Sequence, residues 1–245
     1  MAEVSNLIPK FIQQQYLQGR TVGQFSAYTM YIDLSGFTPL TETLMSKGTD
    51  GAEELSLILN SIFGSMVEHV YRHNGFIPYF AGDAITAIFP EGTPGVDARM
   101  LLQAGQALEA YFNEEGLKKT RFGDFRIGIK IRLSYGAVQW GIVGRQLKAF
   151  YFRGPAIDNP TQADEVDAER GIIFDQHLFG RINSEKAPVA QVVREKYYRL
   201  IEKLPPSTPP LLPSYPDLAQ RAREAKLLAE FYPPAILNFD ERGEF

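Results

Sequence analysis

The stretch Tyr31–Glu42, YIDLSGFTPLTE, constrains the fold more than any other part of the chain. An apolar run, Ala27–Leu34, predicts a buried strand, and it carries one aspartate, Asp33, near its end. Small residues follow and predict a turn that leads into a helix. Because a carboxylate among apolar residues is costly unless it is ionised and paired, the stretch predicts a strand–turn–helix unit with a charged group at its tip.

A second aspartate lies in a similar place. In Gly75–Phe89, two apolar runs flank AGDA, which predicts a β-hairpin with its turn at Gly82 and Asp83. Taken alone, Asp33 is equally compatible with a helix N-cap, and AGDA alone favours an ordinary tight turn. The two aspartates together, each at a strand end beside glycine, favour a magnesium site, because Mg²⁺ takes one or two carboxylates plus substrate phosphates.

The remaining pattern predicts an α+β fold. An apolar helical face covers Asp50–Asn74, and a second helix is expected over residues 94–115. Phe125–Gly144 alternates apolar and polar residues and predicts a long strand, with QLKAFYFRG as its hairpin partner. A helix over residues 155–170 and a strand at GIIFD follow, and the runs PVAQVV and KYYRLI favour a further strand. This order suits a mixed or antiparallel sheet with helices packed on one face.

Composition changes at Leu204, beyond which half of the 16 prolines lie. The run LPPSTPPLLPSYP predicts an extended connector, and Asp217–Phe231 predicts a short helix inside this tail. We therefore expect an N-terminal lead-in at residues 1–24, one folded domain at residues 25–203, and a Pro-rich linker at residues 204–245 that leads to a second domain.

Charge and composition exclude several classes of protein. The net charge of −4 and the lack of basic runs argue against nucleic-acid binding, and the absence of cysteine excludes disulfides and Cys-based zinc sites. No apolar run reaches the roughly 20 residues of a membrane helix, and the N-terminus lacks the centre of a signal peptide. We expect a cytoplasmic protein without a membrane partner. His69 and His73 are predicted to be surface histidines rather than a metal pair.

The two motifs YIDLSGFTPLTE and FAGDAITAIF, in this order and with a helix between them, resemble the class III nucleotidyl cyclases. Weaker similarity continues through IGIKIRLSYGAV and FYFRGPAIDNPTQADEV, and it is strongest to the first catalytic half of the bicarbonate-regulated soluble adenylyl cyclases. The resemblance implies a ferredoxin-like βαββαβ core that pairs head-to-tail with a second cyclase domain. It also implies two Mg²⁺ or Mn²⁺ ions and a nucleoside triphosphate substrate, with ATP expected.

The resemblance also assigns residues. Asp33 and Asp83 correspond to the metal-binding carboxylates, and Leu34 contributes its backbone carbonyl. The substrate side comprises the backbone of Gly36, Phe37 and Thr38, together with Tyr79, Gly82 and Lys130. Lys130 matches a basic residue that lies near the triphosphate in the soluble group; a solvated strand lysine is the equally plausible alternative.

The sequence departs from the family in two ways. Tyr79 stands where the family has its adenine-reading lysine, so base specificity is open. Asp158 and Gln162 stand where a complete half has the Asn and Arg that stabilise the transition state, and neither replaces a guanidinium. Thr161 falls at the place of an arginine linked to bicarbonate, so bicarbonate control is not supported.

These departures predict a half-site that forms 3′,5′-cyclic nucleotide and pyrophosphate only when a complementary domain supplies Asn and Arg. The isolated chain is then expected to have little or no activity. The alternative is an inactive pseudo-cyclase that serves as a nucleotide-binding regulatory or dimerisation module. A phosphohydrolase that shares only the two-aspartate metal site is a more remote reading.

Overall fold

The computed structural model describes residues 8–166, 170–182, 188–194, 196–206 and 229–231. The described elements include both helices and strands, interspersed along the chain. In chain order they are α1 Lys10–Leu17, β1 Val22–Ser35, α2 Phe37–Met45, α3 Thr49–Arg72, β2 Phe76–Ala81, β3 Ala84–Pro90, α4 Ala98–Glu115, β4 Leu117–Thr120, β5 Gly123–Arg126, β6 Gly128–Val143, β7 Ala149–Arg153, α5 Pro155–Val166, β8 Gly171–Asp175, α6 Gln176–Phe179, β9 Ala190–Arg194, β10 Tyr197–Leu200 and the 3₁₀ helix η3 Ala229–Phe231.

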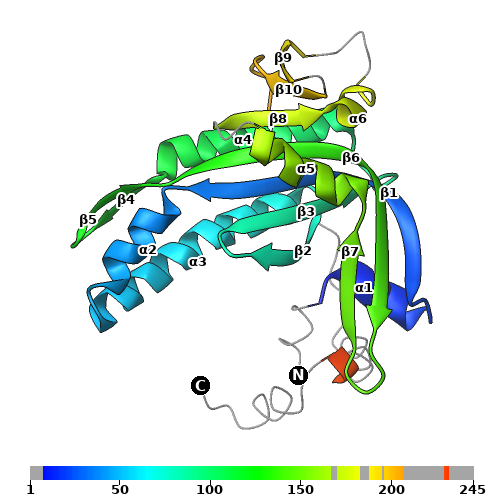
Figure 1. Cartoon of the computed structure of the whole chain (residues 1–245), viewed down its shortest axis with the longest axis horizontal. Helices are drawn as coiled ribbons and strands as arrows, with labels where there is room; N and C mark the ends of the chain where they lie inside the picture. The colour runs from blue at the N-terminus through cyan, green and yellow to red at the C-terminus, as the bar shows by residue number, and fades with distance from the viewer. Residues whose placement is uncertain (1–7, 167–169, 183–187, 195, 207–228, 232–245) are drawn as a thin grey trace.

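An eight-stranded mixed sheet organises these elements, in the order β2-β3-β1-β6-β8-β10-β9, with β7 paired to β6 (Figure 1). The long strands β1 and β6 run antiparallel along their whole shared length, from Val22 opposite Gly141 to Ser35 opposite Gly128. Strand β8 pairs parallel to β6, and the remaining pairings of this sheet are antiparallel. The predicted α+β fold with a mixed sheet, including the hairpin with its turn at residues 82–83, is confirmed.

The alternation of side chains along the central strands separates two hydrophobic clusters. Tyr28, Met30, Ile32 and Leu34 of β1 point to the face covered by α2, α3 and α4, and they belong to the larger cluster. This face of the sheet is the main core, as the helical periodicity of residues 50–74 predicted. Its close packing holds the carboxyl end of β1 in place.

The other face has a smaller cluster, which α1 and α5 help to form. Phe11 of α1 packs edge-on against Trp140, with ring centroids 5.4 Å apart, and tilts onto Phe25 at 4.7 Å. Thr29 of β1 donates a hydrogen bond of 2.5 Å to the carbonyl of Ala156 in α5. Residues 8–24 of the predicted lead-in are therefore part of the folded unit, and β1 begins within them at Val22.

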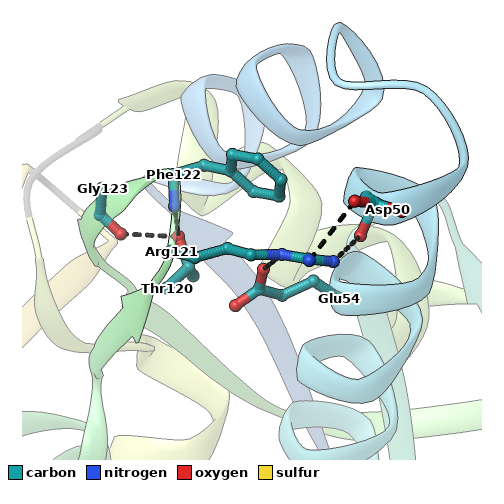
Figure 2. A network of polar contacts seen from close by, with 6 residues as sticks. All are labelled: Asp50, Glu54, Thr120, Arg121, Phe122 and Gly123. Carbon is teal, nitrogen blue, oxygen red and sulfur yellow. Dashed lines mark hydrogen bonds and ion pairs between the residues drawn. The ribbon is translucent and has the colours of Figure 1, made fainter.

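A short hairpin, β4–β5, is joined to the start of α3 through Arg121 (Figure 2). The guanidinium lies 3.3 Å from a carboxylate oxygen of Asp50 and 3.3 Å from one of Glu54, and it also donates to the carbonyl of Asp50. Arg121 lies over the ring of Phe122 at 5.0 Å. These contacts hold the hairpin against α3 just before the chain enters β6.

The interpretation of His69 and His73 as surface histidines is wrong. His73 is buried and its Nδ1 lies 2.8 Å from the carbonyl of His69, while His69 Nε2 lies 2.7 Å from the carbonyl of Ala104 in α4. The apolar packing between α3 and α4 encloses both rings because they lie on the helix side that faces α4. Burial, reinforced by His73 and Arg72 and opposed by the Ala104 carbonyl, lowers the pKa of His69 to about 4.

The start of the predicted linker also contacts the domain. Leu204 is buried, its backbone N–H donates to Gln106, and Gln103 donates to the carbonyl of Pro205. Most of the predicted tail helix at residues 217–231 lies outside the described residues, apart from η3. None of the helices that the structure describes combines the length and apolar content needed to cross a membrane.

Candidate active site

The turn from β1 into α2 positions Asp33. Leu34 is buried in the main core and anchors the strand end, while the preceding Asp33 points to the opposite face and stays partly exposed. Gly36 begins α2 with φ 83°, and a β-carbon there would lie 2.3 Å from the carbonyl oxygen of Arg126. Both the backbone conformation and the lack of space therefore require glycine at this turn.

The β2–β3 hairpin brings Asp83 to the same edge. Gly82 has φ 65° in the turn, and Ala84 is the residue directly opposite Asp33 in the β1–β3 register. Directly opposed residues of antiparallel strands have Cα atoms about 5 Å apart, so Asp83, one residue before Ala84, neighbours Asp33. The structure thus brings together the two aspartates that lie far apart in the sequence.

Lys130 of β6 completes this group of charged residues. Its Cα is opposite that of Asp33 on the other side of β1, and its Nζ lies 2.8 Å from Asp33 Oδ2. Each of the two side chains is only 18% exposed. The interpretation of Lys130 as a solvated strand lysine is therefore wrong.

The first turn of α2 offers backbone N–H groups beside the aspartates. Phe37 packs against the main core, Thr38 is exposed, and no side chain caps the helix at Gly36. The first N–H groups of a helix have no partner inside it, and such an end favours phosphate. The backbone of Gly36, Phe37 and Thr38 is thus available to an anion that also reaches Asp33.

Tyr79 lies on the same face as Asp33 and Lys130. It pairs with Thr86, which is opposite Tyr31, two residues before Asp33 in β1. The Tyr79 side chain is 40% exposed, so the phenol ring is accessible to a ligand. Its place is consistent with a base-contacting residue, although no lysine-type charge is present.

The positions of the family's Asn and Arg lie on the exposed side of α5. Asp158, Thr161 and Gln162 are all exposed, whereas the neighbouring Asn159 turns inward and donates 2.9 Å to Asp175. No guanidinium from these positions reaches outward. This surface presents the carboxylate of Asp158 and the amide of Gln162.

The donor set at the edge fits a divalent cation that brings its own phosphate ligands. Asp33 and Asp83 offer carboxylate oxygens and Leu34 a backbone carbonyl, which are the hard ligands that Mg²⁺ and Mn²⁺ prefer. Within the described part of the chain, no cluster of three or more His, Cys, Asp or Glu side chains forms a metal cage. The site therefore suits a metal–nucleotide complex better than an ion bound by protein alone.

Sequence reasoning missed Arg170 as a neighbour of this site and predicted no role for the Ser35 hydroxyl. Both side chains approach the same spot above Gly128 in β6, within 3 Å of where a β-carbon would lie. Gly171 pairs with Lys130 in the parallel β6–β8 register, which brings Arg170 beside the site. No local motif marks such a parallel pairing.

Comparison with family models finds no match. The chain is 25% identical over 193 residues to adenylate cyclase type 10 of Mus musculus, an alignment that covers 75% of this chain and 12% of that protein. It is 28% identical over 144 residues to an adenylate cyclase of Anabaena cylindrica, covering 58% of this chain and 28% of the relative. The chain thus spans about an eighth of the mouse relative and about a quarter of the cyanobacterial one.

Solved structures show the same fold. A bacterial light-regulated adenylyl cyclase superposes with TM-score 0.61 at 16% identity, over 94% of this chain and 64% of the other. The guanylyl cyclase domain of the RhoGC fusion protein from Blastocladiella emersonii superposes with TM-score 0.55 at 18% identity, over 74% and 97%. With the fold, the motif order and the sequence similarity in agreement, the chain has the fold of the class III nucleotidyl cyclase catalytic domains and is similar in sequence to the soluble adenylate cyclases.

Proposed function

We propose that this chain is a cyclase half-domain that binds a metal–nucleoside triphosphate, with ATP as the expected nucleotide. Paired head-to-tail with a complementary cyclase domain, it forms the 3′,5′-cyclic monophosphate and releases pyrophosphate. The observation that carries this proposal is the convergence of Asp33, Asp83 and Lys130 beside the uncapped start of α2. Similarity to adenylate and guanylate cyclases supports the reaction class.

Each residue has a physical task in this proposal. Asp33 and Asp83 hold two Mg²⁺ or Mn²⁺ ions, which when bound lower the pKa of the ribose 3′-hydroxyl and neutralise the phosphates. The N–H groups of Gly36, Phe37 and Thr38 orient the phosphates at the start of α2. Lys130 leaves Asp33 for the triphosphate, and Tyr79 contacts the base by stacking or through its hydroxyl.

The transition-state charge needs a group that the chain lacks at the family position. Asp158 and Gln162 are exposed on α5 and offer neither the amide nor the guanidinium at their family places. A second cyclase domain with Asn and Arg supplies both, and we expect little turnover by the chain alone. The same observation favours the alternative, a pseudo-cyclase that binds nucleotide and regulates or dimerises without turnover.

Nucleotide binding tests the shared part of both functions. Calorimetric titration with a non-cyclisable ATP analogue and Mn²⁺ should show binding to wild type that Asp33→Ala/Asp83→Ala abolishes. The matched control, Glu114→Ala/Asp124→Ala, removes two exposed carboxylates outside the site and should bind as wild type does. Equal binding by wild type and the Asp33/Asp83 variant would overturn the assignment of the aspartates.

Turnover then separates the two functions. The chain mixed or fused with a cyclase domain that carries Asn and Arg should form cyclic nucleotide and pyrophosphate in equal amounts. Binding without any product in a stable heterodimer would favour the regulatory module. Release of inorganic phosphate in place of pyrophosphate would indicate a phosphohydrolase.

A further inference from the structure

The guanidinium of Arg170 lies where a side chain at position 128 would extend, and residue 128 is a glycine. A β-carbon on Gly128 would be 2.8 Å from Arg170 Cζ and 3.0 Å from Arg170 Nε. The same β-carbon would lie 2.8 Å from Ser35 Oγ, which approaches from the neighbouring strand β1. Glycine at position 128 therefore leaves a slot in which a guanidinium and a hydroxyl meet.

This slot lies on the same face of the sheet as the side chains of Asp33 and Lys130 in the candidate active site. Ser35 follows Asp33 by two residues in β1, and Gly128 precedes Lys130 by two in β6. Side chains two residues apart on a strand point to the same face. The hydroxyl of Ser35, the guanidinium of Arg170 and the ammonium of Lys130 thus border one area.

The hydrogen-bonding state of these groups suits an anion as their ligand. Ser35 Oγ is buried and has no hydrogen-bond partner in the part of the chain that the structure describes. Arg170 is exposed, and no described carboxylate forms an ion pair with it. A buried hydroxyl without a partner is unfavourable, and a guanidinium binds phosphate oxygens through two parallel hydrogen bonds.

We propose that Arg170, Ser35 and Lys130 form a phosphate-binding corner that holds the terminal phosphates of the triphosphate and the pyrophosphate product. The proposal rests on the function proposed above and assigns its polyphosphate side to residues of this chain. The corner gives the half-site a guanidinium of its own, from a position eight residues beyond Gln162. Because all three groups belong to one chain, the corner binds polyphosphate without a partner domain.

Titration with inorganic pyrophosphate tests the corner directly. Calorimetry on the full chain uses pyrophosphate with Mg²⁺, the non-cyclisable ATP analogue with Mn²⁺, and AMP as a ligand without terminal phosphates. Arg170→Gln should weaken pyrophosphate and the triphosphate analogue about tenfold and leave AMP unchanged. Arg170→Lys keeps the charge but loses the planar guanidinium, so its affinities for pyrophosphate and the triphosphate analogue should lie between those of wild type and Arg170→Gln.

A matched control removes an exposed arginine elsewhere. Arg145→Gln, in the loop between β6 and β7, changes the net charge equally and should leave all three affinities within about twofold of wild type. Gly128→Ala adds the methyl group that the slot cannot hold and should reproduce the loss seen in Arg170→Gln. Circular dichroism confirms that each variant is folded before titration.

The outcomes separate the corner from the proposed function. Equal pyrophosphate affinity in wild type, Arg170→Gln and Arg145→Gln would overturn the corner, even if Asp33→Ala/Asp83→Ala abolishes nucleotide binding and so supports the half-site. Equal losses of pyrophosphate affinity in Arg170→Gln and Arg145→Gln would show that only the net charge matters. That result would also overturn the corner. A third outcome is that pyrophosphate binding is lost only in Arg170→Gln, while Asp33→Ala/Asp83→Ala binds the metal–nucleotide complex as wild type does. This result would support the phosphate-binding corner and overturn the proposed function.

Discussion

Lys130 Nζ lies 2.8 Å from Asp33 Oδ2, and the two residues are directly opposed between β6 and β1. The ammonium of Lys130 thus forms an ion pair with a carboxylate oxygen that a divalent cation would also use as a ligand. A metal ion that binds Asp33 has to compete with Lys130, whereas a nucleotide that draws Lys130 to its phosphates removes that competition. This geometry predicts that metal binding depends on nucleotide.

Replacement of Lys130 should separate these two effects. Lys130→Met is expected to bind Mn²⁺ alone about fivefold more tightly, because removal of the ion pair, whose side chains are each 18% exposed, frees the Asp33 carboxylate by roughly 1 kcal/mol. The same variant should bind the ATP analogue more weakly, since it lacks the phosphate-directed charge. Electron paramagnetic resonance of free Mn²⁺ measures the first effect and calorimetry the second. Lys130→Arg is the charge-conserving control, and unchanged Mn²⁺ affinity in Lys130→Met would contradict the competition.

Two glycines with positive φ differ in the space around them. Gly82→Ala, where no atom lies within 4 Å of an added β-carbon, should cost only the conformational strain of about 1 kcal/mol. Gly36→Ala adds a collision with the Arg126 carbonyl and should cost about 3 kcal/mol, with loss of nucleotide binding. Urea unfolding measures both free energies. Similar values for the two variants would show that the close approach at Gly36 has no energetic weight.

The buried carboxylate of Asp175 accepts three hydrogen bonds: 2.5 Å from Ser134 Oγ, 2.9 Å from Asn159 Nδ2 and 2.8 Å from the backbone N–H of Leu178. Asp175→Ala leaves these donors without an acceptor and should destabilise the fold by about 3 kcal/mol. Asp158→Asn, on the exposed side of α5, should change the free energy of unfolding by less than about 0.5 kcal/mol. Thermal and urea denaturation compare the variants, and a mild effect of Asp175→Ala would show that water satisfies the donors.

The buried His69 should make stability depend on pH. Its folded pKa of about 4 lies below the ordinary value of 6.5, so between these values the unfolded chain binds more protons. The contribution of His69 is therefore complete above about pH 6.5 and declines by about 3 kcal/mol as the pH falls toward 4. His69→Gln keeps a donor for the Ala104 carbonyl and should flatten this part of the profile, whereas the exposed His177→Gln should not. Urea midpoints from pH 4.5 to 7.5 test this, and parallel profiles for wild type and His69→Gln would exclude His69 as the cause.

Restoring the family residues on α5 tests why the isolated chain is expected to be inactive. Asp158→Asn/Gln162→Arg places an amide and a guanidinium on an exposed surface, so the fold should tolerate both changes. The variant homodimer should form cyclic nucleotide from Mn²⁺–ATP at least tenfold faster than wild type, because the guanidinium stabilises developing phosphate charge. Asp158→Asn/Gln162→Lys is the control that carries charge without the planar fork. Chromatography measures the product, and no gain in a confirmed dimer would point to another missing group.

Local patterns predicted much of the fold because their signals lie within one element. The helical face of residues 50–74, the hairpin at residues 82–83 and the alternation in β6 appear in the structure close to their predicted bounds. The hairpin β4–β5 was missed because strands of four residues are too short for a period to stand out from a helix end. The surface interpretation of His69 and His73 failed because the burial of a helix side chain depends on neighbouring elements, here α4, whose Ala104 carbonyl lies 2.7 Å from His69 Nε2.

Residue types at local positions were enough to predict the strand–turn–helix unit at Asp33, the hairpin turn at Asp83 and the absence of a family arginine at Gln162. The pairing of Lys130 with Asp33 and the approach of Arg170 and Ser35 over Gly128 became visible in the folded chain alone. Those contacts arise from the antiparallel β1–β6 register and the parallel β6–β8 register. Strand register is set by the packing of the whole sheet against its helices, and no single segment of the chain carries that information.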